Sequence, residues 1–125
     1  MKLLEIGRLL NAEVLLGQAQ LPSTEIMTIC GSDLMSDVLA YTQYHSLLLT
    51  GLNNVQVIRT AEISGLAGVV FVRGRRPAPE VLRLAAEKNL PVLLTNLPMF
   101  EACGLLYRAG LMGCPSDRKD GSPHV

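Results

Sequence analysis

Residues Ser46 to Pro77 read SLLLTGLNNVQVIRTAEISGLAGVVFVRGRRP and predict a strand, a helix and a second strand. The runs Leu47–Thr50 and Gly68–Val72 are short, continuous and apolar, as strands buried on both faces are. An asparagine pair suits the start of the helix between them, and Gly65 suits its end. Because two parallel strands need such a crossover, the stretch predicts a β-α-β unit with a polar, partly basic loop after each strand.

The same alternation of strands and helices continues on both sides of this unit. Ser32 or Asp33 is a good N-cap for the helix that follows them, and Gly7 is expected to interrupt the short first helix. An alternating order predicts the α/β class, here a three-layer sandwich with a mainly parallel sheet and helices on both sides. The other expected helices cover about residues 1–10, 35–41, 77–89 and 98–110, and the other expected strands cover residues 12–16, 26–30 and 92–95.

The composition sets limits on the class of protein. Apolar residues make up 49% of the 125 residues, which favours one domain with a sizeable core. Eleven basic and eleven acidic residues cancel, so the overall charge attracts neither nucleic acid nor an anionic membrane. No apolar run reaches the roughly 18 to 20 residues that span a bilayer, and the first residues do not resemble a signal peptide. We therefore expect a cytoplasmic protein with no nucleic-acid or membrane partner.

Polar side chains gather in the four loops that follow the expected parallel strands. Ligands of such sheets bind outside the carboxyl ends of the strands, and free backbone N–H groups and guanidinium groups both prefer an anion. We therefore predict a site for a small anionic, phosphate-containing ligand. The alternatives are a solvated loop of arginines and a plain helix cap. The predicted ligand-binding residues are Ser32, Asp33, Thr50, Gly51, Asn53, Asn54, Arg73, Gly74, Arg75, Arg76 and Thr95.

Complete catalytic, metal and cofactor motifs are absent from the sequence. His45 and His124 lie at no telling distance from a nucleophile, and two nearby carboxylates, Asp33 and Asp37, lack a third ligand. The three cysteines, Cys30, Cys103 and Cys114, are widely spaced, without the C-x-x-C pair of a zinc or redox site. We therefore predict no catalytic residue, no metal site and no cofactor, and reduced thiols.

Four segments in order resemble the DRTGG domain family: GSDLMSDVLA from Gly31, LLLTGLNNVQVIRTA from Leu47, VVFVRGRRPAPEV from Val69 and LPVLLT from Leu90. The ending MFEACGLLYRAGL from Met99 is similar to that of small standalone members. The namesake residues are only partly kept. Thr50-Gly51-Leu52-Asn53 stands where the family has Thr-Gly-Asp-Arg, and Arg73-Gly74 stands where a Gly-Gly pair is common.

The resemblance implies one DRTGG-like domain over residues 1–112. Residues 113–125 are polar and without periodicity, so we expect a flexible tail there. The resemblance also implies a fold similar to the N-terminal domain of HPr kinase/phosphorylase, and a non-catalytic regulatory module that forms a homodimer. Small standalone members are often encoded beside hydrogenase genes, and some carry an iron-sulfur label. The alternatives are therefore a redox accessory protein of a hydrogenase system, with iron at Cys30, Cys103 or Cys114, and a phosphoryl-handling enzyme.

Overall fold

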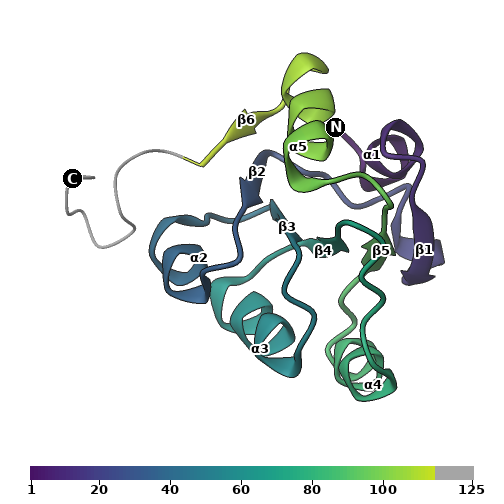
Figure 1. The fold of residues 1–125 in the computed structure, drawn as a ribbon, viewed down its shortest axis with the longest axis vertical. Coiled ribbons are helices and arrows are strands. Elements are labelled where there is room, and N and C mark those ends of the chain that lie inside the picture. Colours follow the sequence, from purple (N-terminus) through teal and green to yellow (C-terminus); the bar gives the residue numbers. More distant parts are fainter. Residues whose placement is uncertain (115–125) are drawn as a thin grey trace.

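One six-stranded sheet carries five α-helices in the computed structural model, which describes residues 1–114 (Figure 1). The predicted three-layer α/β fold is confirmed. In chain order the elements are α1 (Leu3–Leu9), β1 (Glu13–Leu16), the 3-10 helix η1 (Gln18–Gln20), β2 (Thr28–Gly31), α2 (Met35–Tyr41), β3 (Ser46–Thr50), α3 (Val55–Ser64), β4 (Gly68–Phe71), α4 (Pro79–Glu87), β5 (Val92–Leu94), α5 (Met99–Arg108) and β6 (Met112–Gly113).

The strand order β1-β5-β4-β3-β2-β6 explains which helix covers which face. The chain steps from β2 to β5 in one direction through α2, α3 and α4, and right-handed crossovers place these three helices on one face. It then returns across the sheet through α5 to pair β6 with β2, so α5 lies on the opposite face beside α1 (Figure 1). All pairs are parallel except β1 with β5. The start of α5 is thereby brought to the carboxyl ends of the parallel strands.

The local signals of the central unit act as expected. Asn54 caps α3, with its side-chain oxygen accepting a hydrogen bond from the backbone N–H of Gln56 at 3.1 Å. Gly65 ends the helix in the left-handed conformation, with φ of 66°. Strands β3 and β4 are buried along their whole length, as continuous apolar runs in a parallel sheet should be.

Three local expectations were wrong. Gly7 does not interrupt α1, because its carbonyl and that of Ile6 accept hydrogen bonds from the residues that follow the helix. The second strand begins at Thr28, two residues later than expected. Neither Ser32 nor Asp33 is the N-cap of α2, because both lie before the helix and bond to other groups. The N-cap is Leu34, whose side chain makes no capping hydrogen bond.

The core consists of two layers, one on each face of the sheet. The first packs α1 and α5 against side chains such as Leu49 and Leu93. The second packs α2, α3 and α4 against side chains such as Leu48 and Phe71. Neighbouring residues of one strand point to opposite faces, so the buried run of β3 supplies both layers.

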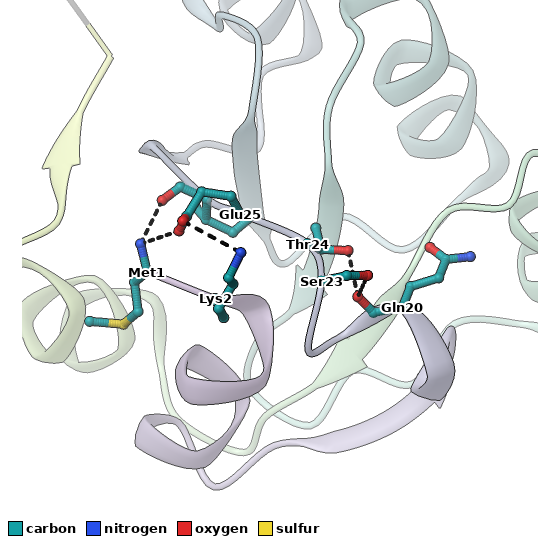
Figure 2. A network of polar contacts seen from close by, with 7 residues as sticks. Met1, Lys2, Gln20, Ser23, Thr24 and Glu25 are labelled. Carbon is teal, nitrogen blue, oxygen red and sulfur yellow. Dashed lines mark hydrogen bonds and ion pairs between the residues drawn. The ribbon is translucent and has the colours of Figure 1, made fainter.

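A polar network fastens the connection between β1 and β2 to the first helix (Figure 2). The Met1 ammonium lies 2.6 Å from a carboxylate oxygen of Glu25, and the Lys2 ammonium lies 3.7 Å from the other oxygen. The hydroxyl of Thr24 donates to the carbonyl of Gln20 at 2.7 Å. The hydrogen bond from the Met1 ammonium lowers the pKa of the Glu25 carboxyl. The end of the connection near β2 is thus fastened to the first two residues, and the Thr24–Gln20 hydrogen bond closes a turn within the connection.

The last described residues belong to the sheet. Strand β6 pairs with β2 through Met112 and Gly113, and the thiol of Cys114 lies 3.7 Å from the hydroxyls of Thr28 and Ser46. Residues 115–125 lie outside the described residues, so the predicted tail stays a prediction, and so does its boundary at residue 113. In the part of the chain that is described, no helix has the length and apolar character needed to cross a membrane.

Candidate functional site

A small polar cavity opens at the carboxyl ends of β2, β3 and β4, and its volume is about 270 Å³. Three consecutive loops and the first residue of α5 surround it. Parallel strands bring these loops together, because their carboxyl ends meet at one edge of the sheet. The lining residues are Asp33, Gly51, Leu52, Val72, Arg73, Arg75 and Met99. Four of the eleven predicted ligand-binding residues, Asp33, Gly51, Arg73 and Arg75, therefore meet at one cavity.

Asp33 joins the loop after β2 to the loop after β3. Its Oδ1 accepts a hydrogen bond from the Thr50 hydroxyl at 2.8 Å and another from the Gly51 N–H at 2.7 Å. The Thr50 hydroxyl oxygen in turn accepts from the N–H of Leu52 at 3.1 Å. These bonds fix the turn that forms one wall of the cavity. Thr50 itself is buried and supports this wall from the interior of the protein.

The Asp33 carboxylate is held in its charged form. Partial burial alone would raise its pKa, but the hydrogen bonds from Gly51, Thr50 and Leu52 act in the other direction, as does the charge of Arg75. The net result is a pKa below the ordinary value of 3.8. At neutral pH the cavity therefore carries one carboxylate beside two guanidinium groups.

The basic loop after β4 is anchored through its backbone. The N–H of Arg73 donates to the carbonyl of Leu97, and the N–H of Gly74 donates to the carbonyl of Thr95, both at 2.9 Å. Arg73 and Gly74 both have positive φ, 59° and 65°, a conformation that a side-chain-bearing residue such as Arg73 adopts at a cost. The bend directs the side chains of Arg73 and Arg75 to line the cavity.

The third arginine has a different environment. A guanidinium nitrogen of Arg76 lies 2.7 Å from Oε1 of Glu13 on β1. Within residues 1–114, neither Arg73 nor Arg75 has a carboxylate within ion-pair distance. Two of the three guanidinium groups are thus unpaired at the cavity.

The remaining predicted residues support the loops without lining the cavity. The Ser32 hydroxyl accepts from the N–H of Leu34 at 3.0 Å, and the Asn53 amide donates to the carbonyl of Arg76 at 3.4 Å. Thr95 is buried, and its hydroxyl donates to the carbonyl of Leu10 at 2.8 Å. The side chain of Asn54 caps α3, and Gly74 supplies the positive φ of the basic loop.

Sequence reasoning missed the apolar part of the cavity. Leu52 follows the Thr-Gly turn, Val72 follows β4 and Met99 begins α5. Leu52 lies within the predicted loop after β3, so the rule that places ligands at strand ends applies to it, whereas the sequence predicts Val72 as the last residue of a strand. No local signal marks Met99, which reaches the cavity because α5 returns across the sheet.

The charged groups around the cavity suit recognition of an anion. Among residues 1–114, no three histidine, cysteine, aspartate or glutamate side chains gather as a metal site requires. Cys30 packs with the α2–α4 layer and Cys103 with the α1–α5 layer, on opposite faces of the sheet. Two guanidinium groups beside an apolar wall can hold a phosphate or carboxylate, and the Asp33 carboxylate can accept a hydrogen bond from a hydroxyl or amino group of the same ligand.

Comparison with known proteins identifies relatives of this domain. The family model of the DRTGG domain matches residues 5–109, which is most of the chain. The Bacillus subtilis (strain 168) protein YtoI is 29% identical over 105 residues, which cover 84% of this chain and 24% of YtoI. The chain therefore spans about a quarter of the length of this relative.

A solved structure has the same fold. It contains the CBS and DRTGG domains of the regulatory region of Clostridium perfringens pyrophosphatase, complexed with an activator, diadenosine tetraphosphate. The TM-score is 0.62 at 15% identity, and the match covers 84% of this chain and 45% of that chain. At this identity the likeness shows the fold alone.

Proposed function

Because the chain belongs to the DRTGG domain family, we propose that it is a regulatory module without catalytic activity that binds a small phosphate-containing ligand in the polar cavity. The observation that carries the proposal is the pair of guanidinium groups, Arg73 and Arg75, which line the cavity without an ion-pair partner in the described residues. An exposed arginine needs no partner, but two on one anchored loop beside a cavity match the charge and geometry of a phosphate.

The size of the cavity limits the ligand. Pockets for drug-sized ligands measure roughly 300 to 1,000 Å³, and this cavity measures about 270 Å³. We therefore expect it to hold the phosphate and the adjoining sugar of a ligand, with the rest outside. In the Clostridium perfringens structure the ligand of the regulatory region is a nucleotide, which supports the inclusion of nucleotides among the candidates.

A ligand regulates only if its affinity differs between two states of the protein. Met99 lines the cavity and its sulfur lies 3.7 Å from the thiol of Cys103 on the next turn of α5. A ligand that contacts Met99 therefore acts on the helix that lies on the outer surface of the α1–α5 layer. We propose that the two states are a monomer and a homodimer.

Isothermal titration calorimetry with inorganic phosphate, ribose 5-phosphate, AMP and ATP tests the proposal. We expect binding to at least one of these probes, with affinity reduced about tenfold by Arg73→Ala or Arg75→Ala, since a charge-assisted hydrogen bond contributes about 1.4 kcal/mol or more. The control is Arg83→Ala, which removes the same charge from an exposed position on α4 and should leave the affinity unchanged. No heat from any probe at millimolar concentration would contradict the proposal.

Three finer predictions from the sequence stay predictions. One is a hydrogenase-related redox partner, together with iron bound by cysteines, and such iron would give visible absorbance after anaerobic purification. A phosphoryl-handling enzyme would release phosphate from ATP in the same cavity. The cytoplasmic location also stays a prediction.

A further inference from the structure

The outer face of α5 exposes large apolar side chains beside a groove. Phe100 is 83% exposed, Tyr107 is 68% exposed and Met112 on the neighbouring strand β6 is 60% exposed. The groove has a volume of about 420 Å³ and runs between α5 and the β2–β6 edge. Ile29, Cys103 and Leu111 line its inner wall, and Phe100 and Tyr107 its outer rim. Such a cluster of exposed apolar groups marks a surface that binds another molecule.

The exposed residues of α5 have a regular arrangement. At about 100° per residue, Gly104 points away from the buried Ala102 and Leu106. Glu101 and Arg108 then flank Gly104 on one side, and both border a second shallow depression. Phe100 and Tyr107 flank it on the other side, at the apolar groove. One side of the exposed face thus carries opposite charges and the other carries aromatic rings.

We propose that a second copy of this chain docks on this face, with the two α5 helices antiparallel and crossing at Gly104. A two-fold axis that reverses the helix direction brings each residue before Gly104 opposite a residue after it, on the same side of the helix. Glu101 then meets Arg108 of the partner subunit, and Phe100 meets Tyr107 of the partner subunit beside the apolar groove. Every one of these pairs occurs twice.

Other features of the helix favour this occupant. A Cβ added at Gly104 would have no atom within 4 Å, so packing within the chain does not require a glycine at this position. The missing side chain leaves room for a close approach of two helices. A parallel arrangement would place the charged side against the aromatic side and lose both kinds of pair. The charges and shape of this face therefore match those of an antiparallel second copy.

The two charges have another explanation within the single chain. Glu101 lies in the first turn of α5 and Arg108 in the last, where each interacts favourably with the helix dipole. That explanation predicts that reversing both charges harms the helix twice. The proposed interface predicts instead that reversing both charges restores the pairing that either single reversal breaks.

Sedimentation velocity of the full chain over about 1 to 100 µM tests the proposal, which specifies the surface of the dimer in the proposed function. We expect a reversible dimer whose dissociation constant rises at least about tenfold in Glu101→Arg and in Arg108→Glu. We expect it to return to near the wild-type value in the double variant. Arg83→Glu on α4, which makes the same charge change away from this face, should have no effect.

Several outcomes would overturn this assignment. They are a monomeric wild-type chain at all concentrations, a dimer that tolerates both single reversals, and a double variant that fails to recover. Because both side chains are exposed, each variant should remain folded. Circular dichroism checks this. Calorimetric titration of Arg108→Glu with the phosphate probes separates the two proposals. Loss of the dimer leaves Arg73 and Arg75 in place at the cavity, so it does not remove the ligand site. An absence of ligand binding, in turn, leaves the sedimentation result unchanged.

Discussion

Oδ1 of Asp33 lies 2.7 Å from the backbone nitrogen of Gly51, although 18 residues separate them in the sequence. The contact joins the loops after two neighbouring parallel strands and sets one wall of the polar cavity. Asp33 therefore has a specific position and a specific charge, and neither follows from a role as a helix cap. We expect its effect on stability and its effect on phosphate affinity to have opposite signs.

Replacement of Asp33 separates these two effects. In Asp33→Ala both hydrogen bonds are lost, and we expect the free energy of unfolding to fall by about 1–2 kcal/mol, discounted for exposure of the carboxylate. In Asp33→Asn an oxygen remains to accept the bonds, so the loss should be smaller. Because the negative charge beside Arg75 is removed, Asp33→Asn should also bind phosphate a few times more tightly. Urea unfolding and calorimetry measure the two quantities, and a weaker affinity in Asp33→Asn would contradict the assigned role.

The lowered pKa of Asp33 predicts how stability depends on pH. The carboxyl holds its proton less tightly in the folded state than in the unfolded state, so its contribution is fully present above the ordinary value of 3.8. It declines as the pH falls below that value, through the pKa of the folded state. Unfolding midpoints of the wild type and Asp33→Asn should converge in this acid range and be furthest apart near neutral pH. A constant difference between them would contradict the prediction.

Two glycines with positive φ should differ in their tolerance of a methyl group. Gly65 ends α3 with φ of 66° and open space around it, so Gly65→Ala should cost only the conformational strain, about 1–2 kcal/mol. Gly17 has φ of 87°, and an added Cβ would lie 2.9 Å from the backbone Cα of Pro91. Gly17→Ala should therefore cost about 2–5 kcal/mol, because overpacking adds to the strain. Urea unfolding of the two variants checks this order, and equal losses would contradict it.

Thr95 illustrates a predicted ligand residue whose hydroxyl has a structural partner. It is buried, and it donates to the carbonyl of Leu10 at 2.8 Å. Thr95→Val should lower the free energy of unfolding by about 1–3 kcal/mol, since a buried carbonyl loses its donor, and should leave phosphate affinity unchanged. Thr60→Val is a matched control in α3, because Thr60 is also buried and does not line the cavity. A loss of phosphate affinity in Thr95→Val would show that its hydroxyl acts at the site.

The fold was more predictable from the sequence than the site. Apolar runs such as Leu47–Thr50 and the cap and stop signals at Asn54 and Gly65 act locally, so they can be recognised without knowledge of the fold. The two-residue strand β6 carries no such signal, because its pairing with β2 depends on the path of α5 across the sheet.

The site depends on contacts between distant segments. The rule of strand ends placed Asp33, Gly51, Arg73 and Arg75 in the right loops, and these line the cavity. It did not distinguish Arg76, whose partner Glu13 lies on the far edge strand β1, from its two neighbours. It also did not find Met99, which joins the cavity only through the return of α5. Tertiary pairing decides which polar residue of a loop is free for a ligand.

The measurement that tests the central claim most directly is a phosphate titration of ¹⁵N-labelled protein followed by amide NMR spectra, repeated with AMP. We predict concentration-dependent shifts of the amides of Gly51, Leu52, Arg73, Gly74 and Arg75, and no shift of amides in α4 such as that of Leu84. The Arg73→Ala, Arg75→Ala double variant should lose these shifts and keep an otherwise folded spectrum. Absence of shifts at the cavity with both probes, or shifts confined to other surfaces, would contradict the assignment of this cavity as the ligand site.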